Sequence, residues 1–227
     1  MQKITVHLLM LSVFFFGLVQ AEVHEVLVSS NNFSPSALTI EAGDTVRWIN
    51  TGGSHNVVAR DNSFRCAEGC DGQGGNGNAS ASAWQVEVTF RQTGTINYFC
   101  EPHDVFGMRG SITVVEPTEP APQIQALPNN SFSPDELTVI AGEKLRITNV
   151  AGVHNFRTNN DDFICSEACV GDNQLLETGP IGFPWDIYIS FDTPGQVPYY
   201  CETHQADGML GIINVLSDNI FANGFEP

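Results

Sequence analysis

The chain has 227 residues, of which 42% are hydrophobic, and its formal net charge at pH 7 is −17. This length and composition are sufficient for one or two domains with packed cores. The acidic balance argues against nucleic acid and anionic lipid as partners. If electrostatics steer association, it favours a partner with a basic or cationic surface; the alternative is that the charge serves only solubility.

The first 21 residues have the features of an export signal. Lys3 precedes an apolar run over residues 4–19, and the stretch that ends at Ala21 offers small residues to a signal peptidase. The run is close to the shortest length of a membrane-spanning helix, so an uncleaved anchor is the alternative. We predict a signal peptide over residues 1–21, cleaved after Ala21, and a periplasmic or secreted mature chain that does not insert into a membrane.

The remainder of the chain is a tandem repeat. The stretch NNFSPSALTIEAGDTVRWIN at 31–50 returns as NNSFSPDELTVIAGEKLRITN at 129–149. Matched positions are 99 residues apart in the first part of each copy and 101 residues apart in the second part. The proline-rich stretch EPTEPAPQ between the copies favours a stiff linker. We predict two domains over 22–117 and 122–216, a linker over 118–121 and a tail over 217–227.

Each copy consists of short segments that are typical of strands. In the first copy these are VHEVLVSS, ALTIEAG, DTVRWINT, WQVEVTF, INYFC and GSITVVE. Apolar and polar residues alternate over 84–90 and again over 185–191, which gives each segment one apolar face. Clusters of Gly, Pro, Asn and Asp separate the segments. We predict an all-β fold with two tandem β-sandwich domains, and a closed barrel is the alternative.

The end of each copy combines the residue types of a soft-metal site. The stretches YFCEPHDVFGM and YYCETHQADGM both contain Cys-x2-His-x4-Met, and each copy has another histidine about 45 residues upstream. Four of the five histidines after the signal peptide fall at matched repeat positions. Histidines with only an ordinary core or surface role would not be expected to match so often. The candidate ligands are His55, Cys100, His103 and Met108 in the first copy and His154, Cys201, His204 and Met209 in the second.

This set of donors suits copper. A thiolate and a thioether favour Cu(I), imidazoles accept Cu(I) and Cu(II), and a trigonal His2Cys site with an axial Met lies between the two preferences. Little rearrangement then accompanies a change of oxidation state. We predict two copper ions, one in each domain, that cycle between Cu(I) and Cu(II). Gly107 and Gly208, just before the methionines, are expected to allow a turn that other residues resist.

These segments resemble the plastocyanin and pseudoazurin branch of the cupredoxins, which are small blue-copper electron carriers. The resemblance is carried by FSPSALTIEAGDTVRWIN, GSHNVV and INYFCEPHDVFGMRGSITV, and by FSPDELTVIAGEKLRITN, GVHNF and VPYYCETHQADGMLGIINV. It implies Greek-key sandwiches and one type 1 copper per domain, with Asn56 and Asn155 hydrogen bonding near the thiolate and the ligand loop. The tandem duplication and the insertions FRCAEGCDGQGGNGNASASA and FICSEACVGDNQLLETGPIGFP depart from the simple carriers.

The other four cysteines form two matched pairs, Cys66 with Cys70 and Cys165 with Cys169. An exported chain folds in an oxidising compartment, and cysteines at this spacing meet if the loop coils into a helical turn. We predict one local disulfide bond in each domain. A second soft-metal site at Cys66 and Cys70 lacks a nearby His or Met, and a pairing across the domains is a further alternative.

The predicted function is that of an exported electron-transfer protein that docks a redox partner protein. Residues beside the ligand loops are expected to form a small apolar docking patch: Pro102 and Phe106 in one copy, Val153 and Ala206 in the other. A copper buffer or delivery protein is the alternative. A multicopper oxidase or copper nitrite reductase needs additional histidines, whereas Phe99 and Tyr200 stand beside the cysteines and the chain has no His-x-His pair. We therefore predict no enzymatic activity.

Overall fold

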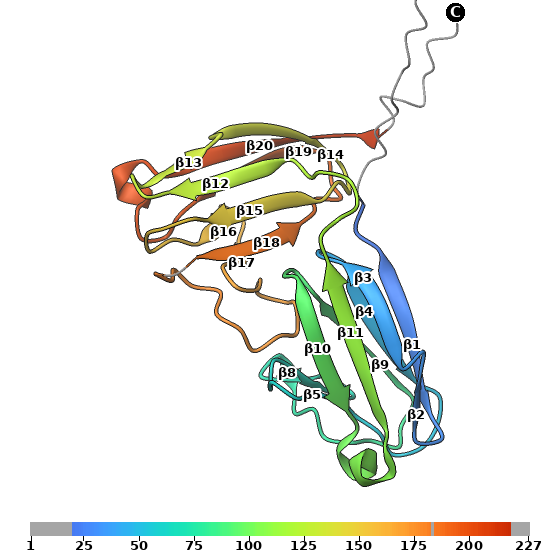
Figure 1. Ribbon diagram of the computed structural model, residues 1–227. Coiled ribbons are helices and arrows are strands. Elements are labelled where there is room, and N and C mark those ends of the chain that lie inside the picture. Colours follow the sequence, from blue (N-terminus) through green and yellow to red (C-terminus); the bar gives the residue numbers. More distant parts are fainter. Residues whose placement is uncertain (1–19, 183, 219–227) are drawn as a thin grey trace, which may run out of the picture.

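The computed structural model describes residues 20–182 and 184–218, which form two β-sandwich domains (Figure 1). Apart from two short 3-10 helices, η1 (Glu101–Phe106) and η2 (Gln205–Asp207), the regular elements in these ranges are strands. The predicted all-β fold with two tandem sandwiches is thereby confirmed. Most of the predicted signal peptide and tail lies outside the described residues, and none of the described helices is long and apolar enough to cross a membrane.

Two sheets face each other in the first domain. Their strand orders are β2-β1-β4-β9 and β3-β11-β10-β5-β6-β7-β8. β1 is parallel to β4, and β3 is parallel to β11, so connections cross between the sheets as in a Greek key. The strands are β1 (Val23–Ser29), β2 (Asn32–Ser34), β3 (Ala37–Glu41), β4 (Thr45–Asn50), β5 (Val57–Ala59), β6 (Arg65–Cys66), β7 (Cys70–Asp71), β8 (Gly74–Gly75), β9 (Trp84–Thr89), β10 (Gly94–Phe99) and β11 (Arg109–Val115).

The second domain repeats this arrangement. Its sheets have the orders β13-β12-β15-β18 and β14-β20-β19-β16-β17, with the same two parallel pairs, β12 with β15 and β14 with β20. The strands are β12 (Gln123–Leu127), β13 (Ser131–Ser133), β14 (Glu136–Ile140), β15 (Leu145–Asn149), β16 (Phe156–Thr158), β17 (Ile164–Cys165), β18 (Trp185–Ile189), β19 (Gly195–Tyr200) and β20 (Leu210–Leu216).

The core of each domain lies between its two sheets. In β9 the residues Trp84, Val86 and Val88 are buried while Gln85 and Glu87 are exposed, as the alternation predicts. Aromatic side chains fill the centre of both domains, where edge-to-face contacts add to the burial of apolar area. Examples are Trp48 with Tyr98 at 5.5 Å and Phe132 with Tyr199 at 4.9 Å between ring centroids.

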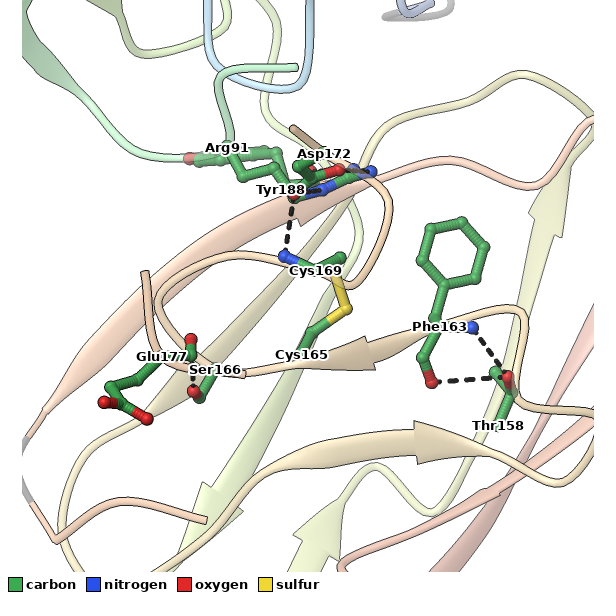
Figure 2. The surroundings of a disulfide bond; sticks show 9 residues. All are labelled: Arg91, Thr158, Phe163, Cys165, Ser166, Cys169, Asp172, Glu177 and Tyr188. Carbon is green, nitrogen blue, oxygen red and sulfur yellow. Dashed lines mark hydrogen bonds and ion pairs between the residues drawn. A yellow bond between two sulfur atoms is a disulfide. The ribbon is translucent and has the colours of Figure 1, made fainter. Parts of the chain in front are cut away.

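The two domains are held together by buried contacts. Asp172, in the insertion of the second domain, accepts two hydrogen bonds from the Arg91 guanidinium of the first, at 2.7 and 2.6 Å (Figure 2). The Arg91 guanidinium also donates to the main-chain oxygen of Tyr188, at 3.0 Å. The Tyr188 ring itself is buried in the hydrophobic core cluster of the first domain. Such contacts fix the orientation of one domain against the other.

A second buried ion pair between the domains involves Lys144. The Lys144 side chain is fully buried, and its ammonium group lies 2.8 Å from Asp44 and 3.1 Å from Glu41 of the first domain. Burial alone would raise the pKa of Asp44, but hydrogen bonds from Lys144 and His24 outweigh it and hold this pKa below its usual value. His24, to which the sequence assigned no role, thus belongs to the domain junction.

Both ligand loops lie far from this junction (Figure 1). η1 is at the end of the first domain that points away from the second, and η2 is at the end of the second domain opposite the linker. The candidate metal centres therefore face separate regions of solvent.

Candidate metal centres

Strand register brings the upstream candidate histidine of each domain, His55 or His154, to the cysteine. In the antiparallel pair of β5 and β10, Val58 lies opposite Phe99, so the chain just before β5 lies beside the chain just after β10. His55 and Cys100 stand at these two positions, and His103 follows on η1, whose N-cap is Cys100. The pair of β16 and β19 does the same in the second domain.

Three side chains of the first domain converge on one point. Cys100 Sγ lies 3.7 Å from His55 Nδ1 and 3.4 Å from His103 Nδ1. The three potential ligand atoms lie within 4.8 Å of one another. With zinc bond lengths as a yardstick, one ion shared by a thiolate and an imidazole separates S from N by ~3.6–3.8 Å. The cluster therefore has the dimensions that a metal ion requires.

The second domain contains the same cluster. Cys201 Sγ lies 3.7 Å from His154 Nδ1 and 3.6 Å from His204 Nδ1. These three ligand atoms also lie within 4.8 Å of one another. Two imidazoles and one sulfur are the donor set of a trigonal copper site, so the residues that are present fit copper in both domains.

Burial changes the protonation of the candidate ligands. His55 and His154 are 1% and 0% exposed. Burial, followed by the neighbouring second histidine, lowers the pKa of each of them, so the neutral imidazole that binds metal is favoured. Burial also raises the pKa of the Cys100 thiol, which means that metal binding must displace its proton.

The predicted methionine ligands lie at the C-terminal end of each ligand loop, where the main chain returns to the cysteine. The side chain of Met108 is buried, and its main-chain oxygen accepts a hydrogen bond of 3.1 Å from Cys100 N–H. Gly107 has a φ of +84°, a left-handed conformation that other residues resist, in agreement with the turn predicted there. In the second domain, Met209 is equally buried and Gly208 has a φ of +88°.

Two further glycines are required by the sites and were missed in the sequence. Gly53 has a φ of +96°, and a Cβ at this position would lie 2.4 Å from His55 Nε2. Gly152 has a φ of +103°, and a Cβ there would lie 2.3 Å from His154 Nε2. Only glycine permits this approach. The signal that could have revealed them is Gly-x-His at the matched repeat positions.

Asn56 joins the histidine segment of the first domain to its cysteine segment. Its Oδ1 accepts a hydrogen bond of 2.9 Å from Glu101 N–H, and its Nδ2 donates to the Glu101 carboxylate at 2.6 Å and to the Gly77 oxygen at 3.0 Å. Arg65 donates two hydrogen bonds to the same carboxylate, at 3.0 and 2.7 Å. The arginine is the main cause of the lowered pKa of Glu101.

Asn155 makes the equivalent two hydrogen bonds with the glutamate of the second domain. Its Oδ1 accepts a hydrogen bond of 3.0 Å from Glu202 N–H, and its Nδ2 donates to the Glu202 carboxylate at 2.6 Å. Arg157 forms an ion pair with this carboxylate. The two glutamates and two arginines were not singled out in the sequence, although each glutamate directly follows a cysteine.

The insertions cover the first histidine of each site. Main-chain hydrogen bonds join His55 to Ser80 in both directions, at 3.1 and 3.0 Å. Equivalent bonds join His154 to Ile181, at 3.2 Å in both directions. The segments that distinguish this chain from simple carriers therefore form walls of the sites.

The predicted docking residues lie on the surface. Phe106 and the adjacent Val105 are 73% and 85% exposed, and the Phe106 ring centroid is 6.4 Å from that of the half-buried His103. In the other domain, Ala206 is exposed and Val153 is 48% exposed. The remaining predicted docking residue, Pro102, is exposed as well.

Both predicted disulfide bonds are present. Cys66 is bonded to Cys70, and Cys165 is bonded to Cys169 (Figure 2). The predicted helical turn is wrong, because the paired cysteines lie opposite each other across tight antiparallel bridges. With these four cysteines bonded, Cys100 and Cys201 are the free thiols among the described residues.

Comparison with known proteins identifies the family. The family of copper binding proteins described as the plastocyanin/azurin family matches residues 23–115 and 127–216. Plastocyanin from Scenedesmus fuscus is 37% identical over 83 residues, which are 36% of this chain and 85% of that protein. Halocyanin from Natronomonas pharaonis is 33% identical over 100 residues, which are 42% and 57% of the two chains.

Among solved structures, amicyanin from Paracoccus versutus matches with 28% identity and a TM-score of 0.31, over 41% of this chain and 81% of that one. The resemblance seen in the sequence and the copper cofactor are thereby confirmed by the family match. Each matched segment contains one His-Cys-His group of the dimensions described above. The chain therefore belongs to the plastocyanin/azurin family of copper binding proteins, with one candidate copper centre in each of its two domains.

Proposed function

We propose that the chain is an exported electron-transfer protein with one type 1 copper in each domain, and that it is not an enzyme. The observation that carries the proposal is the buried His-Cys-His cluster, which occurs twice with nearly the same distances. The proposed ligands are His55, Cys100, His103 and Met108, and His154, Cys201, His204 and Met209. Copper bound in these positions supplies one-electron exchange between Cu(I) and Cu(II).

The protein's own residues hold the ligands rigidly and keep water away. In the first domain, His55 comes from one segment and Cys100 from another, and both segments belong to the same sheet. Asn56 ties the two segments together through its hydrogen bonds with Glu101. A site held in this way changes little between oxidation states, which is the property that an electron carrier needs.

The half-buried second histidine of each site is the proposed route for electrons. His103 lies beside the exposed Val105 and Phe106, which form a small apolar surface for docking. The net charge of −17 favours a redox partner with a basic surface. Small redox complexes test the charge effect: we expect oxidation by a cationic complex to slow as salt is added and oxidation by an anionic complex to accelerate. Equal salt dependence for the two complexes would contradict electrostatic steering.

The proposed function is tested on the purified, oxidised, full-length chain. We expect two copper ions per chain, an intense blue absorption band and a reversible one-electron couple. Replacing Cys100 with Ser should remove about half of the blue absorption, and replacing Cys201 with Ser should remove the other half. Bound copper without a reversible couple would instead support a copper buffer or delivery protein, and one copper per chain would mean that one site has been wrongly assigned.

A further inference from the structure

Each candidate copper centre has a Glu–Arg pair next to its cysteine. We propose that Glu101 with Arg65, and Glu202 with Arg157, are positioning elements of the two centres. Each carboxylate fixes the asparagine that joins the histidine segment to the cysteine segment, and each guanidinium balances the carboxylate charge near the metal. The inference rests on the proposed copper sites and extends them to residues outside the ligand set.

The geometry in the first domain forms a closed ring. Glu101 N–H donates to Asn56 Oδ1 at 2.9 Å, and Asn56 Nδ2 donates back to the Glu101 carboxylate at 2.6 Å. Asn56 follows His55, and Glu101 follows Cys100. A displacement of the carboxylate therefore moves the link between two ligands. Arg65 holds this carboxylate with two charge-assisted hydrogen bonds, a geometry that sets its position as well as its charge.

The two domains reach this arrangement with arginines from different strands. In the first domain, Arg65 on β6 lies opposite Val58 on β5. In the second domain the arrangement is reversed, because Arg157 on β16 lies opposite Ile164 on β17. With the repeat offset of 99, Val58 corresponds to Arg157 and Arg65 corresponds to Ile164. Each cross-strand pair thus has one arginine and one aliphatic residue, and the two residue types have exchanged strands between the domains.

This exchange of strands indicates that the contact between arginine and glutamate matters at both sites. An arginine that served only solubility would have no reason to reach the glutamate after the cysteine in both domains. The sequence position of the arginine differs between the repeats, while its contact with that glutamate is the same. The contact, and not the position, is thus the feature that the two domains share.

The pair has little to contribute to stability. The side chains of Arg65 and Glu101 are 27% and 39% exposed, and ion pairs of this kind contribute about 0–1 kcal/mol. Its effect is therefore expected at the metal. An unbalanced carboxylate one residue from the thiolate favours Cu(II) over Cu(I), whereas removal of the carboxylate charge favours Cu(I).

The experiment uses the full-length chain with Cys201 replaced by Ser, so that only the first centre is measured. Arg65→Val should lower the reduction potential of this centre by up to about 59 mV, which corresponds to a tenfold change in the ratio of Cu(I) to Cu(II). Glu101→Gln should raise the potential. The double variant Val58→Arg/Arg65→Val moves the arginine to the strand that carries it in the second domain and should restore the parent value. Arg65→Lys should restore it in part.

A measurement without copper separates this inference from the proposed function. In the metal-free protein, we expect the Asn56 side-chain NMR signals to shift in Arg65→Val and in Glu101→Gln and to return in the double variant. The inference is wrong if Arg65→Val leaves both the potential and these signals unchanged, or if the double variant behaves like Arg65→Val. A parent protein without a reversible couple would refute the proposed function, while the metal-free signals would still decide the role of the pair.

Discussion

The two insertions occupy the same place in the repeat, yet they do different work. In the first domain the insertion carries Arg65 and the Gly77 oxygen, which hold Glu101 and Asn56 beside the candidate copper centre. In the second domain it carries Asp172, which binds Arg91 of the other domain. Both insertions thus lie beside a candidate metal centre, but only the second one also supplies the Asp172 carboxylate that joins the domains.

The joint between the domains depends most strongly on Tyr188 of the second domain, whose buried side chain belongs to the hydrophobic cluster of the first domain. Its repeat counterpart, Glu87, has a side chain that is 46% exposed. Tyr188→Ala should lower the free energy of unfolding by about 3–5 kcal/mol, as for other large aromatic side chains removed from a core. Chemical denaturation measures the loss. Glu87→Ala is the matched control and should change stability by less than about 1 kcal/mol.

Arg91 should have the next largest effect. The side chains of Arg91 and Asp172 are only 11% and 3% exposed, so Arg91→Ala leaves a buried carboxylate without its partner. We expect a loss of about 3 kcal/mol in the free energy of unfolding. The counterpart of Arg91 in the repeat is the exposed Asp192, and Asp192→Ala should be close to neutral. Equal losses of stability from both substitutions would contradict the interpretation that Arg91, and not its counterpart Asp192, holds the two domains together.

Removing each disulfide bond in turn should distinguish the role of the first insertion at its metal centre from the role of the second insertion in the domain joint. Removing either bond as a double Cys→Ala variant should cost about 2 kcal/mol, because each closes a short loop. Loss of the Cys66–Cys70 bond, next to Arg65, should also change the optical spectrum of the first centre. Loss of the Cys165–Cys169 bond should instead loosen the joint, since Cys169 N–H donates to Asp172 at 2.7 Å. Small-angle scattering and absorption spectra distinguish these outcomes.

The smallest effect should appear at acid pH. The folded pKa of Asp44 is held below its usual value, so the stability that this carboxylate contributes is present above its unfolded pKa, near 3.9. That stability is lost as the pH falls through the lower, folded value. In Lys144→Met, which lacks the main partner of Asp44, the decline of stability below about pH 4 should be less steep. Urea unfolding at a series of pH values measures it, and parallel curves would exclude Lys144 as the cause.

Much of the metal centre could be predicted from the sequence, because the repeat doubles the signal. The matched positions of His55 and His154, with the two Cys-x2-His-x4-Met runs, indicate ligands that a single copy would leave ambiguous. The local disulfide bonds follow from short spacing in the same way. Whether the methionines bind the metal, and where the domain boundaries fall, stay predictions.

The joint between the domains could not be predicted, since it depends on differences between the repeats. Arg91, Asp172 and Tyr188 are unremarkable in the sequence, and only the fold brings them together. The same reason hides the Glu–Arg pairs, because Arg65 and Arg157 are not at equivalent positions. The short strands β5 to β8 were also missed, as segments of two or three residues show no clear alternation.

The opposite placement of the two ligand loops has a consequence for valency. Under the proposed function, a redox partner docked at η1 would leave η2 uncovered, so one chain would have room for two partners at the same time (Figure 1). The joint is built from buried contacts and not from a flexible linker, so the distance between the two docking sites would be fixed. The effective concentration of one bound partner near the other would then follow from this distance.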